Sequence, residues 1–238
     1  MGYKIGSEIV IDGLVFCVDA LDTTSYSSGS TNWNDLVNSN IGTANNAPTF
    51  NSNGYIGFDS GGDEFNFTTN PLHSNSVTKF TVSTWFNCTL SDMNNSLGIF
   101  ITTAPGADPS GGGFWIGYDD RNATHSPVEG IAWNCKTAAG FQRGKSNNNV
   151  ISNNTWHNVT LVLDSQVTLY VDGVSSTNRT QDASGNYTTR DNEFTIGATD
   201  TSGFEYKGLL SNVIVYNKAL AVDEVLQNFN AHKSRFGL

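Results

Sequence analysis

The residues best suited to ligand chemistry in this sequence of 238 residues lie between positions 115 and 133. The group contains three aromatic residues, two carboxylates and one cation: Trp115, Tyr118, Asp119, Asp120, Arg121 and Trp133. Aromatic rings beside hydrogen-bonding side chains are what a concave sugar site requires. A strand tryptophan is more often part of a core, and strand alternation lets Trp115 and Phe114 face opposite sides. The sequence therefore predicts ligand contact here, with a structural role as the alternative.

The sequence gives little support for a catalytic site. The closest pair of carboxylates on a strand-like segment, Asp191 and Glu193, is flanked by Arg190 and Phe194 and is typical of an exposed strand entrance. No Gly-x-Ser-x-Gly turn, which would present a nucleophilic serine, occurs in the sequence. We therefore predict no catalytic residues and a protein that is not an enzyme.

Metal binding has two candidate loops. The four histidines are scattered, and no His-Glu-x-x-His pattern is present. Residues 59–64, with Asp59, Asp63 and Glu64, and the pair Asp119 and Asp120 offer the oxygen ligands that calcium takes. Solvated acidic loops would give the same pattern. Calcium therefore stays possible, but the sequence commits to no metal and no cofactor.

Composition excludes several classes of protein. The net charge is −10, whereas nucleic-acid binding needs clustered Lys and Arg. No apolar run approaches the roughly 18 residues that span a bilayer, so membrane insertion is not expected. Residues 1–10 contain one lysine and no apolar segment, so we expect no signal peptide. The three cysteines, Cys17, Cys88 and Cys135, are too widely spaced for a metal pair and indicate buried thiols.

The elements that must position these side chains are short runs of β-branched and aromatic residues separated by Gly, Asn, Asp and Ser. The predicted strands cover residues 13–19, 55–58, 80–86, 97–101, 114–118, 130–133, 156–163, 167–171, 194–197 and 209–216. In residues 80–86, alternation places Phe80, Val82 and Phe86 on one face and Trp85 on the other. Residues 220–230 carry one apolar stripe at helical spacing. We interpret this helix as a plug at the edge of two packed sheets.

Five of these segments follow one another in an order that resembles the laminin-G-like, concanavalin-A-like jelly-roll superfamily. They are residues 80–86, 154–161, 167–173, 194–197 and 208–217. The resemblance extends over about residues 13–230 and implies an all-β fold, a two-sheet antiparallel jelly-roll sandwich with one short C-terminal helix. The superfamily includes glycoside hydrolases, but a Glu-x-Asp-x-x-Glu strand is absent here. His157 stands where the family carries a structural histidine.

The two ends of the sequence resemble a narrower group. Residues 13–20, together with residues 217–230 and 235–238, are similar to laminin-G-like modules in virion proteins of tailed phages, especially marine ones. This resemblance implies a non-enzymatic virion surface protein, assembled in the host cytoplasm as a capsid decoration or a tail-fibre or appendage component. Its partners would be the major capsid or tail proteins and a cell-surface glycan, with a homo-oligomer possible by analogy. A free carbohydrate-binding lectin is the alternative, and a glycoside hydrolase is a third class.

The chain divides into a jelly-roll domain over residues 13–232, an N-terminal arm over 1–12 and a C-terminal tail over 233–238. Apolar side chains outside the domain predict contacts with a neighbouring protein. These docking candidates are Ile5, Ile9 and Ile11 in the arm and Phe236 in the tail. A frayed terminus is the alternative.

Overall fold

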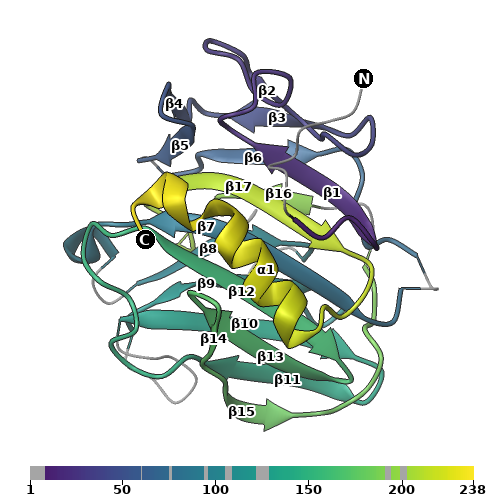
Figure 1. The fold of residues 1–238 in the computed structure, drawn as a ribbon. Coiled ribbons are helices and arrows are strands. Elements are labelled where there is room, and N and C mark those ends of the chain that lie inside the picture. The colour runs from purple at the N-terminus through teal and green to yellow at the C-terminus, as the bar shows by residue number, and fades with distance from the viewer. Residues whose placement is uncertain are drawn as a thin grey trace.

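The computed structural model of the chain describes residues 9–59, 61–74, 77–93, 96–104, 109–121, 129–190, 194–198 and 203–238. Two antiparallel sheets pack face to face, and one helix lies against the outside of the first sheet (Figure 1). The predicted all-β jelly-roll sandwich with a single C-terminal α-helix is therefore confirmed for the described residues. Ile5 lies outside the described residues.

Sheet A has eight strands in the order β14-β13-β12-β7-β17-β5-β4, and β1 also pairs with β17. Its strands are β1 (Leu14–Asp19), β4 (Thr49–Asn51), β5 (Tyr55–Phe58), β7 (Phe80–Asn87), β12 (His157–Asp164), β13 (Gln166–Val171), β14 (Val174–Ser175) and β17 (Gly208–Tyr216). β17 is central, because it pairs with β7 along one edge and with β5 and β1 along the other. At the β12–β13 hairpin, Ser165 adopts a positive φ of 62°.

Sheet B has nine strands in the order β15-β11-β10-β9-β8-β16-β6-β3-β2. Its strands are β2 (Asn32–Asn34), β3 (Ile41–Asn45), β6 (Glu64–Phe67), β8 (Leu97–Thr102), β9 (Phe114–Asp119), β10 (Gly130–Thr137), β11 (Gly140–Lys145), β15 (Asn178–Asp182) and β16 (Phe194–Ile196). A 3₁₀ turn, η1 (Leu90–Met93), precedes β8. The sequence prediction found β8, β9, β10 and β16 but not the shorter or more polar strands of this sheet.

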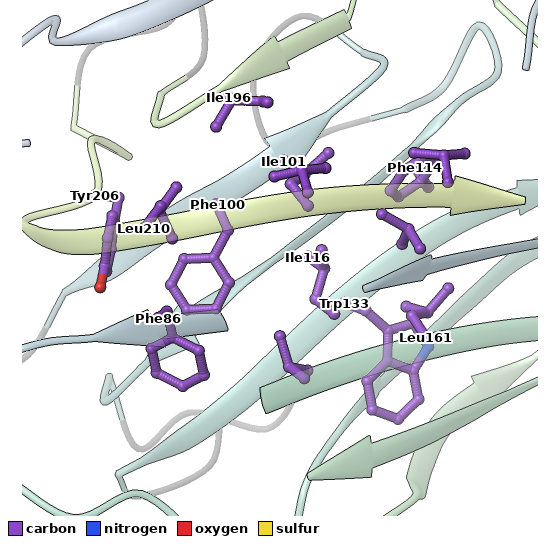
Figure 2. Packing of buried hydrophobic residues seen from close by; sticks show 14 of the residues in the cluster. Phe86, Phe100, Ile101, Phe114, Ile116, Trp133, Leu161, Ile196, Tyr206 and Leu210 are labelled. Atoms are coloured by element: carbon purple, nitrogen blue, oxygen red, sulfur yellow. The ribbon is translucent and has the colours of Figure 1, made fainter. Parts of the chain in front are cut away.

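The core lies between the inner faces of the two sheets and is rich in aromatic rings. Phe80, Val82 and Phe86 of β7 point into it, as their alternation predicts. Figure 2 shows Phe86 of sheet A beside Phe100 of sheet B, with their ring centroids 4.6 Å apart. Aromatic pairs of this kind bury a large apolar area and add roughly 0.5–1.5 kcal/mol beyond it. The three cysteines are buried, free thiols.

The helix α1 (Val222–Lys233) runs across the outer face of sheet A, and a 3₁₀ turn, η2 (Ser234–Phe236), follows it (Figure 1). The Glu224 carboxylate accepts a hydrogen bond from the Ala221 amide (2.9 Å), which satisfies one free N–H of the first turn. The prediction of a plug at the edge of the sandwich was wrong. Outward-facing apolar residues of sheet A, such as Ile214 and Tyr216, need a cover, and α1 supplies it through Val225.

The predicted C-terminal tail is packed against its own domain. The Trp85 ring, on the outer face of β7, stacks on Phe229 of α1 at 5.5 Å and on Phe236 of η2 at 4.3 Å. Arg235 donates two hydrogen bonds to the Asp19 carboxylate, of 2.8 and 2.9 Å. Phe236 is therefore engaged within the chain, and because it is still partly exposed its contact with a partner protein stays a prediction.

The described end of the N-terminal arm is also bound to the domain. Ile9 and Val10 are buried beneath α1, in the apolar cluster on the outer face of sheet A. The Val10 amide donates to Asn228 Oδ1 (2.9 Å), and the Tyr216 hydroxyl donates to the Val10 carbonyl (2.9 Å). Ile9 therefore packs on its own sheet, and this part of the docking prediction is corrected as well. Ile11 alone remains accessible among the described arm residues named above, with 76% exposure.

No helix in the described part of the chain has the length and apolar character needed to cross a membrane.

Candidate functional site

The structure divides the predicted ligand cluster between the two faces of sheet B. Tyr118 of β9 and Trp133 of β10 point into the core and are 0% and 1% exposed. Figure 2 shows Trp133 among the buried side chains, near Leu161 of the opposite sheet. A buried ring has no face on which a sugar could stack, so these two residues are removed from the predicted site. On β9, Tyr118 alternates with Phe114 and Ile116 at every second position, so all three side chains face the core. Trp133 of β10 faces the core with them.

The other half of the cluster faces outward or lies at the end of β9. Trp115 lies on the outer side of sheet B but is only 6% exposed, in an apolar cluster with Ile99 and Ala132, so its ring offers little surface to a ligand. Asp119 is buried and held by Arg121, whose Nε and Nη2 donate to its two carboxylate oxygens at 2.9 and 2.8 Å. Asp120 Oδ1 accepts a hydrogen bond from the Glu129 amide (3.1 Å). The predicted carboxylates are thus engaged within the chain.

The register of sheet B places further functional side chains beside Trp115. Trp115 lies opposite Asn134 of β10, and Asn134 lies opposite Arg143 of β11. On the same face, Lys136 lies opposite Phe141, and Ala132 lies opposite Lys145. We call this group the sheet B strip; it consists of Trp115, Asn134, Lys136, Phe141, Arg143 and Lys145. Sequence analysis named only the first of these residues.

Positive charge is concentrated on the strip. Lys136 Nζ lies 4.4 Å and the Arg143 guanidinium carbon 4.6 Å from the centroid of the Phe141 ring. With Lys145, these are three of the 12 cations in a chain of net charge −10. Cation–π contacts hold both cations at a fixed distance from the ring and contribute about 0.5–1 kcal/mol each at exposed sites. The strip is therefore a basic, aromatic surface on an acidic protein.

Asn134 carries an unsatisfied polar atom in the strip. Asn134 is 2% exposed, and its Oδ1 has no hydrogen-bond partner among the described residues. A buried acceptor without a partner costs roughly 1–3 kcal/mol. Asn134 lies in register between Trp115 and Arg143 and forms part of the buried base of the strip.

The alternation of residue types in β11 could have indicated the strip from the sequence. Phe141, Arg143 and Lys145 alternate with Gln142, which points inward and accepts a hydrogen bond from the Val167 amide (2.7 Å). This period-2 pattern is typical of a strand, but its polar composition hid it from a prediction based on apolar runs.

His157 has a structural role. The Ser152 amide donates to its Nε2 (2.9 Å), so Nδ1 carries the proton and donates to Asp172 Oδ2 (2.7 Å). Both ring nitrogens are engaged, which leaves none for a metal. In the acidic loop predicted for calcium, Asp63 Oδ2 accepts from the Asp59 amide and Glu64 Oε1 accepts from two asparagines. The described residues include no group of three or more potential metal-ligating His, Cys, Asp or Glu side chains.

The laminin G family model described as the concanavalin A-like lectin/glucanases superfamily matches residues 59–226, more than half of the sequence. The chain belongs to this superfamily. The match covers the strands that form the strip and most of sheet A. No curated protein sequence matches this one significantly.

Solved structures share the fold at low sequence identity. The sialidase of Trypanosoma rangeli in complex with sialic acid superposes with a TM-score of 0.64 and 18% identity, over 95% of this chain and 34% of the sialidase chain. The receptor-binding domain of botulinum neurotoxin D gives a TM-score of 0.62 and 13% identity, over 93% of this chain and 53% of that one. The chain thus spans about a third of the sialidase and about half of the neurotoxin domain. These similarities establish the sandwich fold and leave activity to be argued from the site.

Proposed function

We propose that this protein is a non-enzymatic carbohydrate-binding module of a tailed-phage virion surface protein and that the sheet B strip is its glycan-contacting surface. The observation that carries the proposal is the register of β9, β10 and β11. It brings the partly exposed Phe141 ring and the three cations Lys136, Arg143 and Lys145 together on one face, over the buried Trp115 and Asn134. Membership of a superfamily described by its lectins and glucanases supports the same class of ligand.

The chemistry of the strip favours an acidic glycan. Arg143 and the two lysines supply N–H donors for carboxylate or sulfate groups, and hydrogen bonds that involve an ionised partner are the stronger kind. The partly exposed Phe141 ring, already held by Lys136 and Arg143, supplies the apolar contact that carbohydrate rings make with aromatic side chains.

A non-catalytic role agrees with the local carboxylates. Glycoside hydrolysis commonly uses two carboxyl groups on either side of the scissile bond. The strip as defined has none, and Asp119 and Asp120 at the end of β9 are hydrogen bonded to Arg121 and to the Glu129 amide. The proposed strip therefore binds a glycan and leaves its bonds intact.

The described parts of the two terminal segments lie on the same outer face, which supports attachment to a particle through that face. Val10 and η2 both lie on the outer face of sheet A, against Asn228 and Trp85. The strip lies on the other sheet. A protein anchored to a capsid or tail through either end would therefore present the strip to its surroundings. The exposed Ile11 is the described residue best placed to contact the particle.

Glycan binding can be tested with an array of acidic and neutral glycans, followed by calorimetry at low and high salt. We expect acidic glycans to bind and the affinity to fall with salt. The variant Arg143→Ala should lose about 10–100-fold in affinity, because it removes charged hydrogen bonds. The matched control is Lys79→Ala, which removes an exposed cation just before β7, away from the strip. Equal binding by the two variants would contradict the proposed surface, and shortened glycan products would contradict its non-enzymatic role.

The virion context requires a separate measurement. Quantitative mass spectrometry of purified particles should find the protein in hundreds of copies if it decorates the capsid, or in a few dozen or fewer if it belongs to a fibre. Absence from the particle would favour the alternative of a free lectin.

A further inference from the structure

A hollow of about 440 Å³ opens at the rim of the sandwich, at one end of sheet A. β5 and β7 both pair antiparallel with β17, so the C-terminal ends of β5 and β7 lie beside the first residues of β17. The segments that meet there line the hollow: Thr49, residues 57–59, Thr89, Asp92 and residues 207–209. Its volume lies within the roughly 300–1,000 Å³ typical of ligand pockets. The hollow therefore has room for a small ligand.

Gly57 leaves part of the floor of this hollow without a side chain. It lies between Ile56 and Phe58, which both point into the core, so a side chain at Gly57 would point outward. Its Cβ would lie only 2.6 Å from the Thr49 hydroxyl and 3.6 Å from Leu209 Cδ2. Because glycine has no such atom, a ligand can approach the backbone of β5 at this point.

Three exposed charged side chains surround the floor: Asp59, Asp92 and Lys207. Within the described part of the chain, none of the three charged groups has a hydrogen-bond or ion-pair partner. Lys79 and Lys218, by contrast, each contact a carboxylate, at 2.5 and 2.7 Å. The hollow thus carries charges of both signs that do not neutralise one another by direct contact.

The number and sign of these charges define the ligand. Two carboxylates accompany one ammonium group, so the hollow disfavours a simple anion such as phosphate. The ammonium group of Lys207 disfavours a metal ion, because like charges repel. A ligand can pair with all three side chains only if it carries two cationic groups and one anionic group. The apolar side chain of Leu209 and the hydroxyl of Thr49 would contact the part of the ligand between these groups.

We propose that this hollow binds a free basic amino acid, with Lys207 on its carboxylate and Asp59 and Asp92 on its two cationic groups. Lysine and arginine carry two cations and one anion at neutral pH, which matches the three side chains in sign and number. The aliphatic stem of the ligand would lie over Gly57 and against Leu209. The hollow is separate from the sheet B strip, and neither proposal depends on the other.

The test titrates the full chain with L-lysine, L-norleucine and cadaverine in the presence of EDTA, with binding followed by calorimetry and by NMR amide shifts. Norleucine lacks the ε-ammonium group of lysine, and cadaverine lacks the carboxylate, so each analogue omits one contact. We expect lysine to bind at millimolar concentration and to shift residues 57–59 and 207–209. Each analogue should bind at least about fivefold more weakly, which is the worth of one exposed ion pair.

Two variants test the assignment of the charges. Lys207→Met should remove the preference for lysine over cadaverine, and Asp92→Asn should weaken lysine binding at least about fivefold. The matched controls are Lys79→Met and Asp164→Asn, which alter an exposed ion pair elsewhere on the molecule and should leave lysine binding unchanged. All four side chains are exposed, so the Tm of each variant should stay close to that of the parent protein.

Absence of lysine binding at millimolar concentration would overturn the proposal. Equal affinity for lysine and either analogue would also overturn it, because one of the three charges would then be unused. The same conclusion would follow if Lys207→Met kept the preference for lysine over cadaverine. Binding that appears only when EDTA is replaced by calcium would identify a metal site and contradict a direct contact with the amino acid.

Discussion

The outer faces of the two sheets differ in how far the rest of the chain covers them. On sheet A, Ile214, Tyr216 and Trp85 are covered by α1, by η2 and by residues Ile9 and Val10 of the same chain. On sheet B, the strip carries lysine, arginine and phenylalanine side chains that stay partly exposed. The difference shows that one sandwich can use one outer face to secure its own termini and keep the other for contacts. The following changes test this division, from the largest expected effect on stability to the smallest.

Replacing Trp85 by alanine should have the largest effect. The substitution removes a fully buried ring, and with it the stacking contacts to Phe229 and Phe236, from the interface between sheet A and the C-terminal segment. We expect the free energy of unfolding to fall by about 3–5 kcal/mol, measured by urea denaturation. Phe141→Ala in the strip is the matched control and should cost less. Similar losses for the two variants would mean that the faces do not differ as described.

Removal of the Arg235 side chain should have the next largest effect. In Arg235→Leu, the partly buried Asp19 carboxylate loses two hydrogen bonds from the guanidinium. We expect a loss of about 1.5–3 kcal/mol, read from the same denaturation curves. Lys79→Ala, which breaks an exposed ion pair with Asp164, should have a smaller effect. A neutral Arg235→Leu variant would show that the C-terminal turn is held by its aromatic contacts alone.

The pH dependence of stability should report on the covered face. Burial lowers the pKa of His232 in the folded protein below its ordinary value of 6.5. The unfolded chain therefore binds the proton first as the pH falls, and the stability contributed by the neutral ring is lost between pH 6.5 and the lower folded pKa. Denaturation midpoints from pH 7.5 to 5 should decline less steeply for His232→Gln than for the parent protein. Parallel curves would contradict this assignment.

The smallest effect is expected in the strip. Lys136→Ala removes a partly exposed lysine whose ammonium group lies over the Phe141 ring. The stability should change by less than about 1 kcal/mol, whereas affinity for an acidic glycan should fall if the proposed function is correct. A larger loss of stability would mean that this face, like that of sheet A, is structural.

Apolar periodicity predicted much of the fold. Strands such as β5 and β9 match the predicted residues within one position because each is a continuous run of apolar residues and glycine. Strands such as β3 and β11 were missed because polar sequences become strands only through pairing with their neighbours. The C-terminal end of the helix was predicted to within three residues. Its position against sheet A was not predicted, because that position depends on which sheet has an apolar outer face.

The candidate site was predicted less well than the fold. Grouping Trp115 with Tyr118 and Trp133 ignored the alternation that separates them. Lys136 and Arg143 are brought beside Trp115 only by sheet register, which a single sequence does not specify.

The position of β17 also constrains how the protein is made. β1 pairs with no described strand except β17, and β7 has only β12 on its other side. Until residue 216 has left the ribosome, the first strand of the chain has no partner and an edge of β7 stays open. At roughly 5–20 residues per second, the nascent chain carries these unpaired edges for much of its synthesis. Edges of this kind are sites of aggregation. The yield of the folded protein in a cell should therefore depend on chaperones that bind the nascent chain until β17 has been synthesised.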